Sequence, residues 1–170
     1  MIWCDYMIED GLRNHDINIQ PYFEEQLQPN SYDVCIGDEI ISDGVKYKLP
    51  YTFKHGEFIL ATTNEYIEIN SSCCCMIDGK STPARHGICV HLTAGFIDCG
   101  FRGNITLEMV NFGRDFVLEK GMKIGQLVFF ESPTPEHPYN GHYQNQKGVT
   151  PPWDNYERAF PRSSGRYDVL

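Results

Sequence analysis

The sequence has little positive charge and no long apolar run. Its 170 residues include 14 Lys and Arg against 23 Asp and Glu, a formal net charge of −9. So acidic a chain is not expected to bind duplex DNA nonspecifically or an anionic membrane, because both attract basic surfaces. The longest apolar run, residues 73–77, is far short of the ~20 residues of a membrane span. We therefore expect neither nucleic acid nor a membrane as partner.

A secretory leader and a disulfide framework are also missing. Residues 1–6 read Met-Ile-Trp-Cys-Asp-Tyr, without the basic and apolar segments of a signal peptide. The seven cysteines are odd in number and three are consecutive at 73–75, which is not typical of secreted disulfide-rich domains. We expect free thiols in a cytoplasmic protein, or one in the host cytoplasm if it is viral.

What the sequence does contain is a succession of short strand patterns. One helix is predicted over residues 5–13, with Asp5 as its cap and Ile8 and Leu12 on one face. Beyond it, alternating or fully apolar segments bounded by Gly, Pro, Asn and Asp predict strands. These are residues 32–36, 39–41, 45–49, 57–61, 65–69, 73–77, 88–91, 104–110, 116–118 and 123–131.

Strands that follow one another without helices favour an all-β barrel, sandwich or jelly roll over a parallel-sheet nucleotide fold. The composition changes near residue 133, because six prolines follow among Gly, Asn, Gln and Tyr. Such a segment is typical of an extended tail on a surface, over a ligand or a neighbouring subunit. We expect a β domain over residues 1–132 and a tail over residues 133–170, within one structural unit.

A possible zinc motif is incomplete. His55-Gly56-Glu57 matches the H-x-E half of the zinc deaminase signature, in which the metal activates a water molecule. The P-C-x-x-C half is missing from the sequence, and successive residues at 73–75 would point to opposite faces of a strand. We therefore expect no catalytic zinc.

The segment Gly79-Lys80-Ser81-Thr82 combines a glycine, a cation and two hydroxyls at a predicted turn after a strand. Backbone N–H groups and hydroxyls there could bind phosphate oxygens. It is not a Walker motif, because the upstream glycine and a following helix are missing. Taken alone, these residues are more typical of an ordinary polar turn.

Glu108 lies on the polar face of the strand predicted at 104–110. Leu107 and Met109 belong to the opposite, apolar face. A strand is a rigid support for a general base, although a single strand Glu is usually a surface carboxylate. The glycine-rich turn at 95–103 brings Asp98 and Arg102 near the start of this strand.

Five segments now form a pattern, in the order 28–34 (QPNSYDV), 79–85 (GKSTPAR), 91–108, 121–127 (GMKIGQL) and 143–148 (YQNQKG). Over residues 4–151 the chain resembles the zinc-independent dCTP deaminases of the trimeric dUTPase-like superfamily. The resemblance implies a distorted jelly-roll subunit and a homotrimer with active sites between subunits. It also implies dCTP and dUTP as ligands and dTTP as a candidate inhibitor.

The resemblance assigns a catalytic group. Glu108 would take a proton from the water that attacks C4 of cytosine and pass it toward N3 and the leaving amine. Ser81, Arg85 and the backbone carbonyl of Ala94 would hold that water and stabilise the tetrahedral intermediate. Asp98 would contact the 3′-hydroxyl or orient the water attacking the α-phosphorus. Mg²⁺ would be held through the triphosphate, with no protein metal ligand.

Nucleotide contacts are implied for a larger set: Lys80, Ser81, Thr82, Thr93, Asp98, Phe101, Gln126, Tyr139, Tyr143 and Gln146. Phe101 would pack on the sugar and disfavour a 2′-hydroxyl. Two positions depart from the family, since His142 replaces a usual Lys and Pro83 a usual Leu. Lys147, or a protonated His142, could supply the missing contact to the triphosphate.

Alternatives remain open. Gly95 stands where members that only deaminate tend to have His. Residues 93–103 therefore resemble the bifunctional members, which form dUMP and pyrophosphate. Gln126 also favours the bifunctional alternative. A plain dUTPase usually ends in a Gly-rich, Phe-containing motif, whereas this tail reads Tyr-Gln-Asn-Gln-Lys-Gly. The third alternative, a non-catalytic nucleotide-binding regulator, is disfavoured because Glu108, Ser81 and Arg85 are all present.

Overall fold

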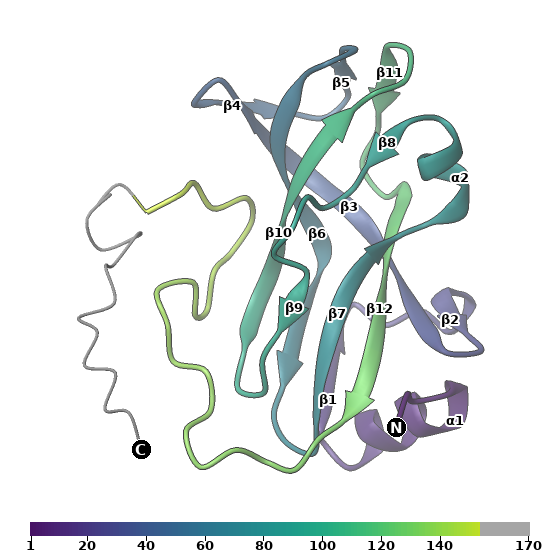
Figure 1. Ribbon diagram of the computed structural model, residues 1–170, viewed down its shortest axis with the longest axis vertical. Coiled ribbons are helices and arrows are strands. Elements are labelled where there is room, and N and C mark those ends of the chain that lie inside the picture. Colours follow the sequence, from purple (N-terminus) through teal and green to yellow (C-terminus); the bar gives the residue numbers. More distant parts are fainter. Residues whose placement is uncertain (154–170) are drawn as a thin grey trace, which may run out of the picture.

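The fold is mainly β, as a computed structural model that describes residues 1–153 shows (Figure 1). Helix α1 (Asp5–Arg13) comes first, at the bounds predicted for it. The elements that follow are β1 (Ile17–Gln20), the 3-10 helix η1 (Glu24–Gln26), β2 (Leu27–Gln28), β3 (Ser31–Ser42), β4 (Val45–Lys48), β5 (Tyr51–Phe53), β6 (Phe58–Ile69), β7 (Cys73–Gly79), α2 (Ser81–Arg85), β8 (Ile88–Cys89), β9 (Phe96–Ile97), β10 (Arg102–Asn111), β11 (Phe116–Leu118) and β12 (Lys123–Glu131).

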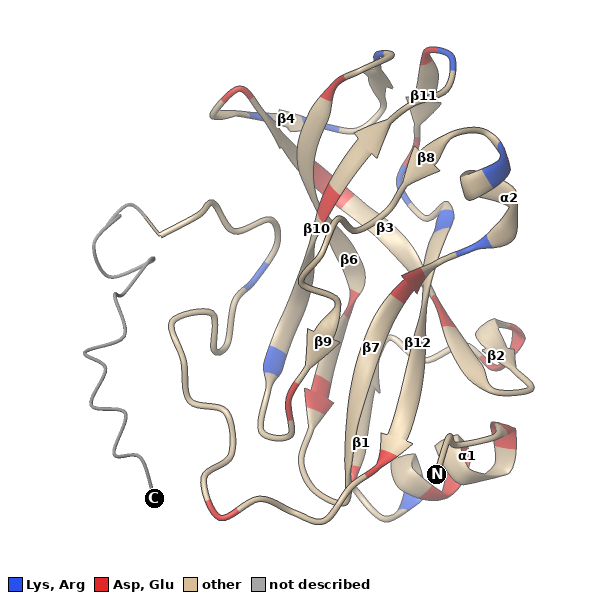
Figure 2. Ribbon diagram, viewed as in Figure 1, with Lys and Arg blue, Asp and Glu red and all other residues tan. Residues whose placement is uncertain are grey.

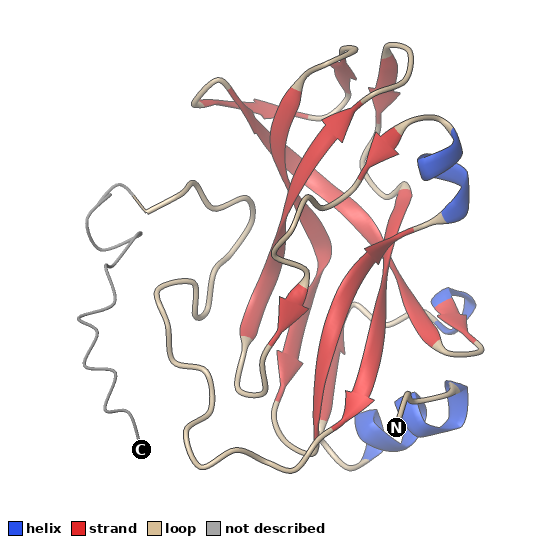
Figure 3. Ribbon diagram, in the orientation of Figure 1, coloured by secondary structure: helices blue, strands red, loops and turns tan. Residues whose placement is uncertain are grey.

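One ten-stranded sheet forms the body of the molecule, and Figure 3 shows how its strands curl around the core. The strand order is β8-β10-β6-β3-β12-β7-β9, with β1 on β6 and with β2 and β4 on β3. β5 and β11 pair separately. The long strand β3 joins the two halves, because it pairs with β12 through residues 32–35 and with β6 through Ile36, Ile40 and Ile41. The all-β prediction is confirmed.

The core follows from side-chain alternation along the strands. On β10, Ile105, Leu107 and Met109 are buried while the residues between them are partly exposed. On β7, Cys73 and Cys75 are buried and Cys74 is half-buried. All seven cysteines are free, as predicted. Burying a large apolar side chain stabilises a fold by about 1.5–3 kcal/mol. This alternation therefore fixes which face of β10 packs on the core and which face carries the polar side chains.

Some predicted boundaries were wrong. The segments 32–36 and 39–41 form one strand, β3. Gly37 does not make a turn between them but lies where β3 passes close to β6, since a Cβ there would be 2.7 Å from Thr62 Cγ2. The segments 57–61 and 65–69 likewise form one strand, β6. The cap of α1 is Cys4, and Asp5 is the first helical residue, whose carboxylate accepts a hydrogen bond from the Tyr6 N–H.

The tail follows the edge of β10, as the yellow-green ribbon in Figure 1 shows. The Asn145 N–H donates to the Arg102 carbonyl (2.7 Å) and the Asn104 N–H donates to the Gln146 carbonyl (3.1 Å). Gly103 makes this approach possible, since its φ is +154° and a Cβ would lie 2.8 Å from Gln146 Cγ. The division of the chain at residue 133 stays a prediction, and residues 154–170 of the predicted tail lie outside the described residues.

Among residues 1–153, no helix has the length and apolar character that crossing a membrane requires.

Candidate active site

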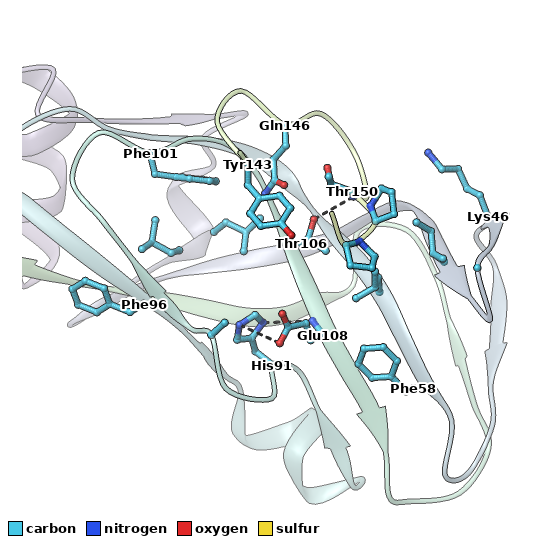
Figure 4. Close-up of a pocket in the computed structure, with 18 of the residues that line it drawn as sticks. Lys46, Phe58, His91, Phe96, Phe101, Thr106, Glu108, Tyr143, Gln146 and Thr150 are labelled. Atoms are coloured by element: carbon cyan, nitrogen blue, oxygen red, sulfur yellow. Dashed lines mark hydrogen bonds and ion pairs between the residues drawn. The ribbon is translucent and has the colours of Figure 1, made fainter. Parts of the chain in front are cut away.

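A cavity of about 1250 Å³ opens beside the polar face of β10 (Figure 4). β10 contributes Glu108 and Thr106, the segment between β8 and β9 contributes His91, and the tail contributes Tyr143, Gln146 and Thr150. The tail is fixed to β10 here, since the Thr150 N–H donates to Thr106 Oγ1 at 3.3 Å. We call this the β10 cavity; one wall of it is the chain's own tail.

Glu108 points into the β10 cavity beside the ring of His91 (Figure 4). About a third of its side chain is exposed (34%), whereas the His91 side chain is nearly buried (8%). His91 Nε2 lies 4.0 Å from Glu108 Oε2, and the Glu108 N–H donates to His91 Nδ1 at 3.5 Å. Within residues 1–153, His91 Nε2 has no hydrogen-bond partner. The carboxylate is therefore held on a rigid strand, open to the cavity and next to one imidazole.

Six further predicted residues share this cavity. They are Ala94, Asp98, Phe101, Tyr139, Tyr143 and Gln146. Phe101 is buried and its ring lies 6.0 Å from that of Tyr139, while Gln146 Nε2 donates to the Asn104 carbonyl at 2.6 Å. Gln146 Oε1 is buried and has no partner among the described residues. The cavity thus offers an unused acceptor on Gln146 in addition to the carboxylate of Glu108.

The remaining predicted residues lie elsewhere, where β7 leads into α2 next to β12. We call this region the α2 corner: Lys80, Ser81, Thr82, Arg85 and Gln126. None of them lines the β10 cavity, so within one subunit the structure does not bring Ser81 or Arg85 to Glu108. Thr93 is exposed and also lies outside the cavity lining. Figure 2 shows basic residues before and on α2 and at the adjacent start of β12.

The geometry of the α2 corner corrects one prediction. A five-residue helix follows Lys80, where we predicted a turn without a helix, and Lys80 is its N-cap residue. The Lys80 ammonium group pairs with the buried carboxylate of Asp33, and Lys123 Nζ lies 3.6 Å from the other Asp33 oxygen. Gln126 accepts a hydrogen bond from Ser31 Oγ and donates to the Gly79 carbonyl, both at 2.9 Å. Ser81, Thr82 and Arg85 are exposed.

The position of the unusual His142 is also clear. It is exposed, does not line the cavity, and stacks on Trp153 with ring centroids 3.6 Å apart. The Trp153 N–H donates to the Tyr143 hydroxyl at 3.3 Å, so the stack is linked to a cavity residue. Lys147 is exposed and lies outside the lining as well.

The residues of the incomplete zinc motif, His55 and Glu57, are hydrogen-bonded to other protein groups. His55 Nδ1 lies 2.7 Å from the Gly113 carbonyl, and the Glu57 carboxylate accepts hydrogen bonds from Ser42 and Tyr51. Burial raises the pKa of Glu57, but these hydrogen bonds outweigh burial, so its pKa lies below the ordinary value. Within residues 1–153, no three His, Cys, Asp or Glu side chains are arranged to hold a metal ion. That the chemistry needs no zinc stays a prediction.

His91 and Asp33 are the two residues that the sequence reasoning missed. Both lie inside segments that resemble the family, but nothing in their spacing marks them. His91 reaches Glu108 only because β8 and β10 pair, and Asp33 reaches Lys80 only because β3 and β7 both pair with β12.

The chain is similar in sequence to known proteins. A family described as dCTP deaminase-like matches residues 45–132. A "dCTP deaminase, dUMP-forming" of Bifidobacterium adolescentis is 39% identical over 179 residues, covering 89% of this chain and 93% of that protein. One of the same description from Methanospirillum hungatei is 37% identical over 174 residues, covering 88% of this chain and 94% of that protein.

Two solved structures show the same fold. A 2′-deoxycytidine 5′-triphosphate deaminase from Agrobacterium tumefaciens superposes with a TM-score of 0.67 at 16% identity, over 77% of this chain and 48% of that one. The chain thus spans about half the length of that structure. The EIAV dUTPase superposes with a TM-score of 0.52 at 18% identity, over 74% of this chain and 98% of that one. The predicted dUTPase-like fold is confirmed.

Proposed function

The chain belongs to the dCTP deaminase-like family, and we propose that it hydrolyses dCTP to dUMP, ammonia and pyrophosphate, as an enzyme of pyrimidine deoxynucleotide metabolism. One water molecule replaces the 4-amino group and a second cleaves the bond between the α- and β-phosphates. The observation that carries the proposal is the position of Glu108, on a rigid strand inside a cavity that also holds Ala94 and Gln146.

Glu108 acts as the proton carrier of the deamination. Its carboxylate accepts one proton from the water that attacks C4 and delivers it to N3. It then takes the second proton from the new hydroxyl on C4 and delivers it to the departing amine, as the C4–N bond breaks. Such general acid–base catalysis contributes ~10²–10⁴-fold to a rate. The partial exposure of the side chain in the cavity keeps it within reach of both water and substrate.

Gln146 recognises the pyrimidine. Donation from Nε2 to the Asn104 carbonyl fixes the orientation of the amide, which leaves Oε1 as a buried, unused acceptor. A buried acceptor without a partner costs about 1–3 kcal/mol, so a ligand that brings an N–H donor is favoured there. The 4-amino group of cytosine is such a donor. Phe101 packs under the sugar, and Asp98 contacts its 3′-hydroxyl or orients the second water.

The α2 corner completes the site from a neighbouring subunit of a homotrimer. Ser81, Thr82 and Arg85 are exposed on their own subunit, which supports a role toward another copy of the chain. Ser81 and Arg85 would hold the attacking water, while Lys80, Thr82 and Gln126 would contact the phosphates. These are hydrogen-bond donors of the kind that stabilise developing negative charge.

Magnesium enters with the substrate. Both oxygens of the buried Asp33 carboxylate already face lysine ammonium groups, so this carboxylate is not an open metal ligand. Mg²⁺ would be held by the phosphates of the substrate, and it would supply positive charge that neutralises them. Inhibition by dTTP stays a prediction.

The test is an assay of the purified protein with dCTP and Mg²⁺ that resolves ammonia, dUTP, dUMP and pyrophosphate. We expect ammonia, dUMP and pyrophosphate in equal amounts. Ammonia with accumulating dUTP would restrict the activity to deamination. Cleavage of added dUTP without ammonia release from dCTP would indicate a dUTPase. Nucleotide binding without turnover would indicate a regulator.

A further inference from the structure

We propose that His91 is a positioning residue whose imidazole ring fixes the direction of the Glu108 carboxylate in the β10 cavity. The inference rests on the proposed function, because it names the group through which Glu108 is held ready. His91 does not need to touch the nucleotide for this role.

The ring of His91, instead of a residue of a neighbouring strand, accepts the hydrogen bond of the Glu108 N–H. β8 pairs with β10 only at Val110↔Cys89 and Asn111↔Ile88, after which the chain leaves the ladder. Two residues beyond Cys89, the His91 ring lies beside β10 and accepts the Glu108 N–H on Nδ1 at 3.5 Å. A ring nitrogen that accepts a hydrogen bond carries no proton, so the neutral ring has its proton on Nε2. The backbone of Glu108 thereby selects the tautomer.

The proton on Nε2 faces the carboxylate. Nε2 is 4.0 Å from Glu108 Oε2, buried, and without another partner in residues 1–153. Leaving such a donor unpaired costs about 1–3 kcal/mol, which favours closure of this gap by a small rotation of Glu108. One carboxylate oxygen is then anchored on the ring, and the other remains free for proton transfer.

The ring itself has little freedom. Its side chain is 8% exposed, and the neighbouring Gly95 packs against β7, where the Ile77 N–H donates to the Gly95 carbonyl at 2.8 Å. A Cβ on Gly95 would lie 2.8 Å from the Ile77 carbonyl oxygen and 3.6 Å from His91 Cδ2. The glycine therefore allows the segment to pack closely on β7 with the imidazole beside it. A fixed ring is what a positioning role requires.

Three substitutions separate this role from a structural one. His91→Leu removes both nitrogens. His91→Asn places a polar atom near Nδ1 and keeps the partner of the Glu108 N–H, whereas His91→Gln places an amide nitrogen near Nε2 and keeps the donor toward Oε2. His137→Leu, at an exposed tail residue outside the cavity lining, is the matched control. Each variant is compared with the parent in kcat and KM for ammonia release and in melting temperature.

We expect His91→Leu to lower kcat by about 10–100-fold, the range for misplacing a reacting group by ~1 Å, with KM changed less than about threefold. His91→Gln should recover most of kcat, His91→Asn should stay near the Leu variant, and the control should match the parent. Equal recovery by Asn and Gln, a kcat for His91→Leu within about twofold of the parent, or a rise in KM alone would overturn the proposal.

A structural readout makes the inference independent of the assay. Crystals of the parent and of His91→Leu should show the Glu108 carboxylate in different rotamers, and an identical rotamer would overturn the proposal. If the parent released no ammonia from dCTP, the proposed function would fail, and the Glu108 rotamers would still decide the role of His91.

Discussion

The β10 cavity and the α2 corner hold the two halves of one predicted site, but they are built in different ways. One wall of the cavity is the chain's own tail, and the cavity's carboxylate stands within a ten-residue strand. The corner presents Ser81, Thr82 and Arg85 openly on a helix of five residues. The difference supports the proposal that each chain holds the proton-carrying group in its own cavity and presents the α2 corner to another subunit.

The largest effect is expected from Glu108→Gln, which disables the cavity half alone. A carboxamide keeps the shape of the side chain but cannot accept the proton, so ammonia release should fall by about 10²–10⁴-fold. The dissociation constant for dCTP, measured by calorimetry, should change little. Glu119→Gln, at an exposed position, is the matched control. Ammonia release near the parental rate would remove Glu108 from the mechanism.

Gly103→Ala should loosen the wall of the cavity while leaving the corner intact. The new Cβ would lie 2.8 Å from Gln146 Cγ at a φ of +154°, so the tail must shift away from β10. Because Tyr143 and Gln146 shift with it, we expect KM for dCTP to rise roughly tenfold, the equivalent of ~1.4 kcal/mol. Gly121→Ala is the control, since its φ is +83° but nothing lies within 4 Å of the added Cβ. An unchanged KM would mean that the tail is not part of the binding site.

Asp33→Asn perturbs the corner instead. The buried carboxylate pairs with Lys80 and faces Lys123, so its neutralisation should lower the free energy of unfolding by about 1–3 kcal/mol. Asp38→Asn provides the contrast, because the exposed Asp38–Lys48 pair should contribute less than about 1 kcal/mol. Denaturant titration of both variants measures the difference. Equal losses would show that Asp33 does not organise the corner.

The smallest effect is expected from removing zinc. A zinc-selective chelator in excess Mg²⁺ should leave ammonia release unchanged, because neither region gathers three metal-binding side chains among residues 1–153. Inhibition that added zinc reverses would contradict the account.

The sequence predicted the local structure of the β10 cavity better than that of the α2 corner, for physical reasons. Alternation along β10 is a local property, and it placed Glu108 correctly on the polar face. The helix after Lys80 was missed because it has only five residues, one of them Pro83, too few to show a helical period. Gly37 was interpreted as a strand boundary because a close strand crossing and a turn both favour glycine.

The contact between His91 and Glu108 could not be predicted, because it depends on where β8 stops pairing with β10. The resemblance implied active sites between subunits, but the sequence did not show which of the predicted residues lie apart within one subunit. Spacing places Ser81 and Arg85 on the same element, but it does not say which copy of the chain they serve.

The central claim is that each active site combines the β10 cavity of one subunit with the α2 corner of another. The most direct test mixes subunits that carry Glu108→Gln with subunits that carry Arg85→Ala, each of which we expect to be inactive alone. If every site takes its cavity from one subunit and its corner from another, random assembly should restore about a quarter of the parental ammonia release, since half of the cavities and half of the corners are intact. Mixed assemblies isolated through two different affinity tags, folded and yet without ammonia release, would contradict the account.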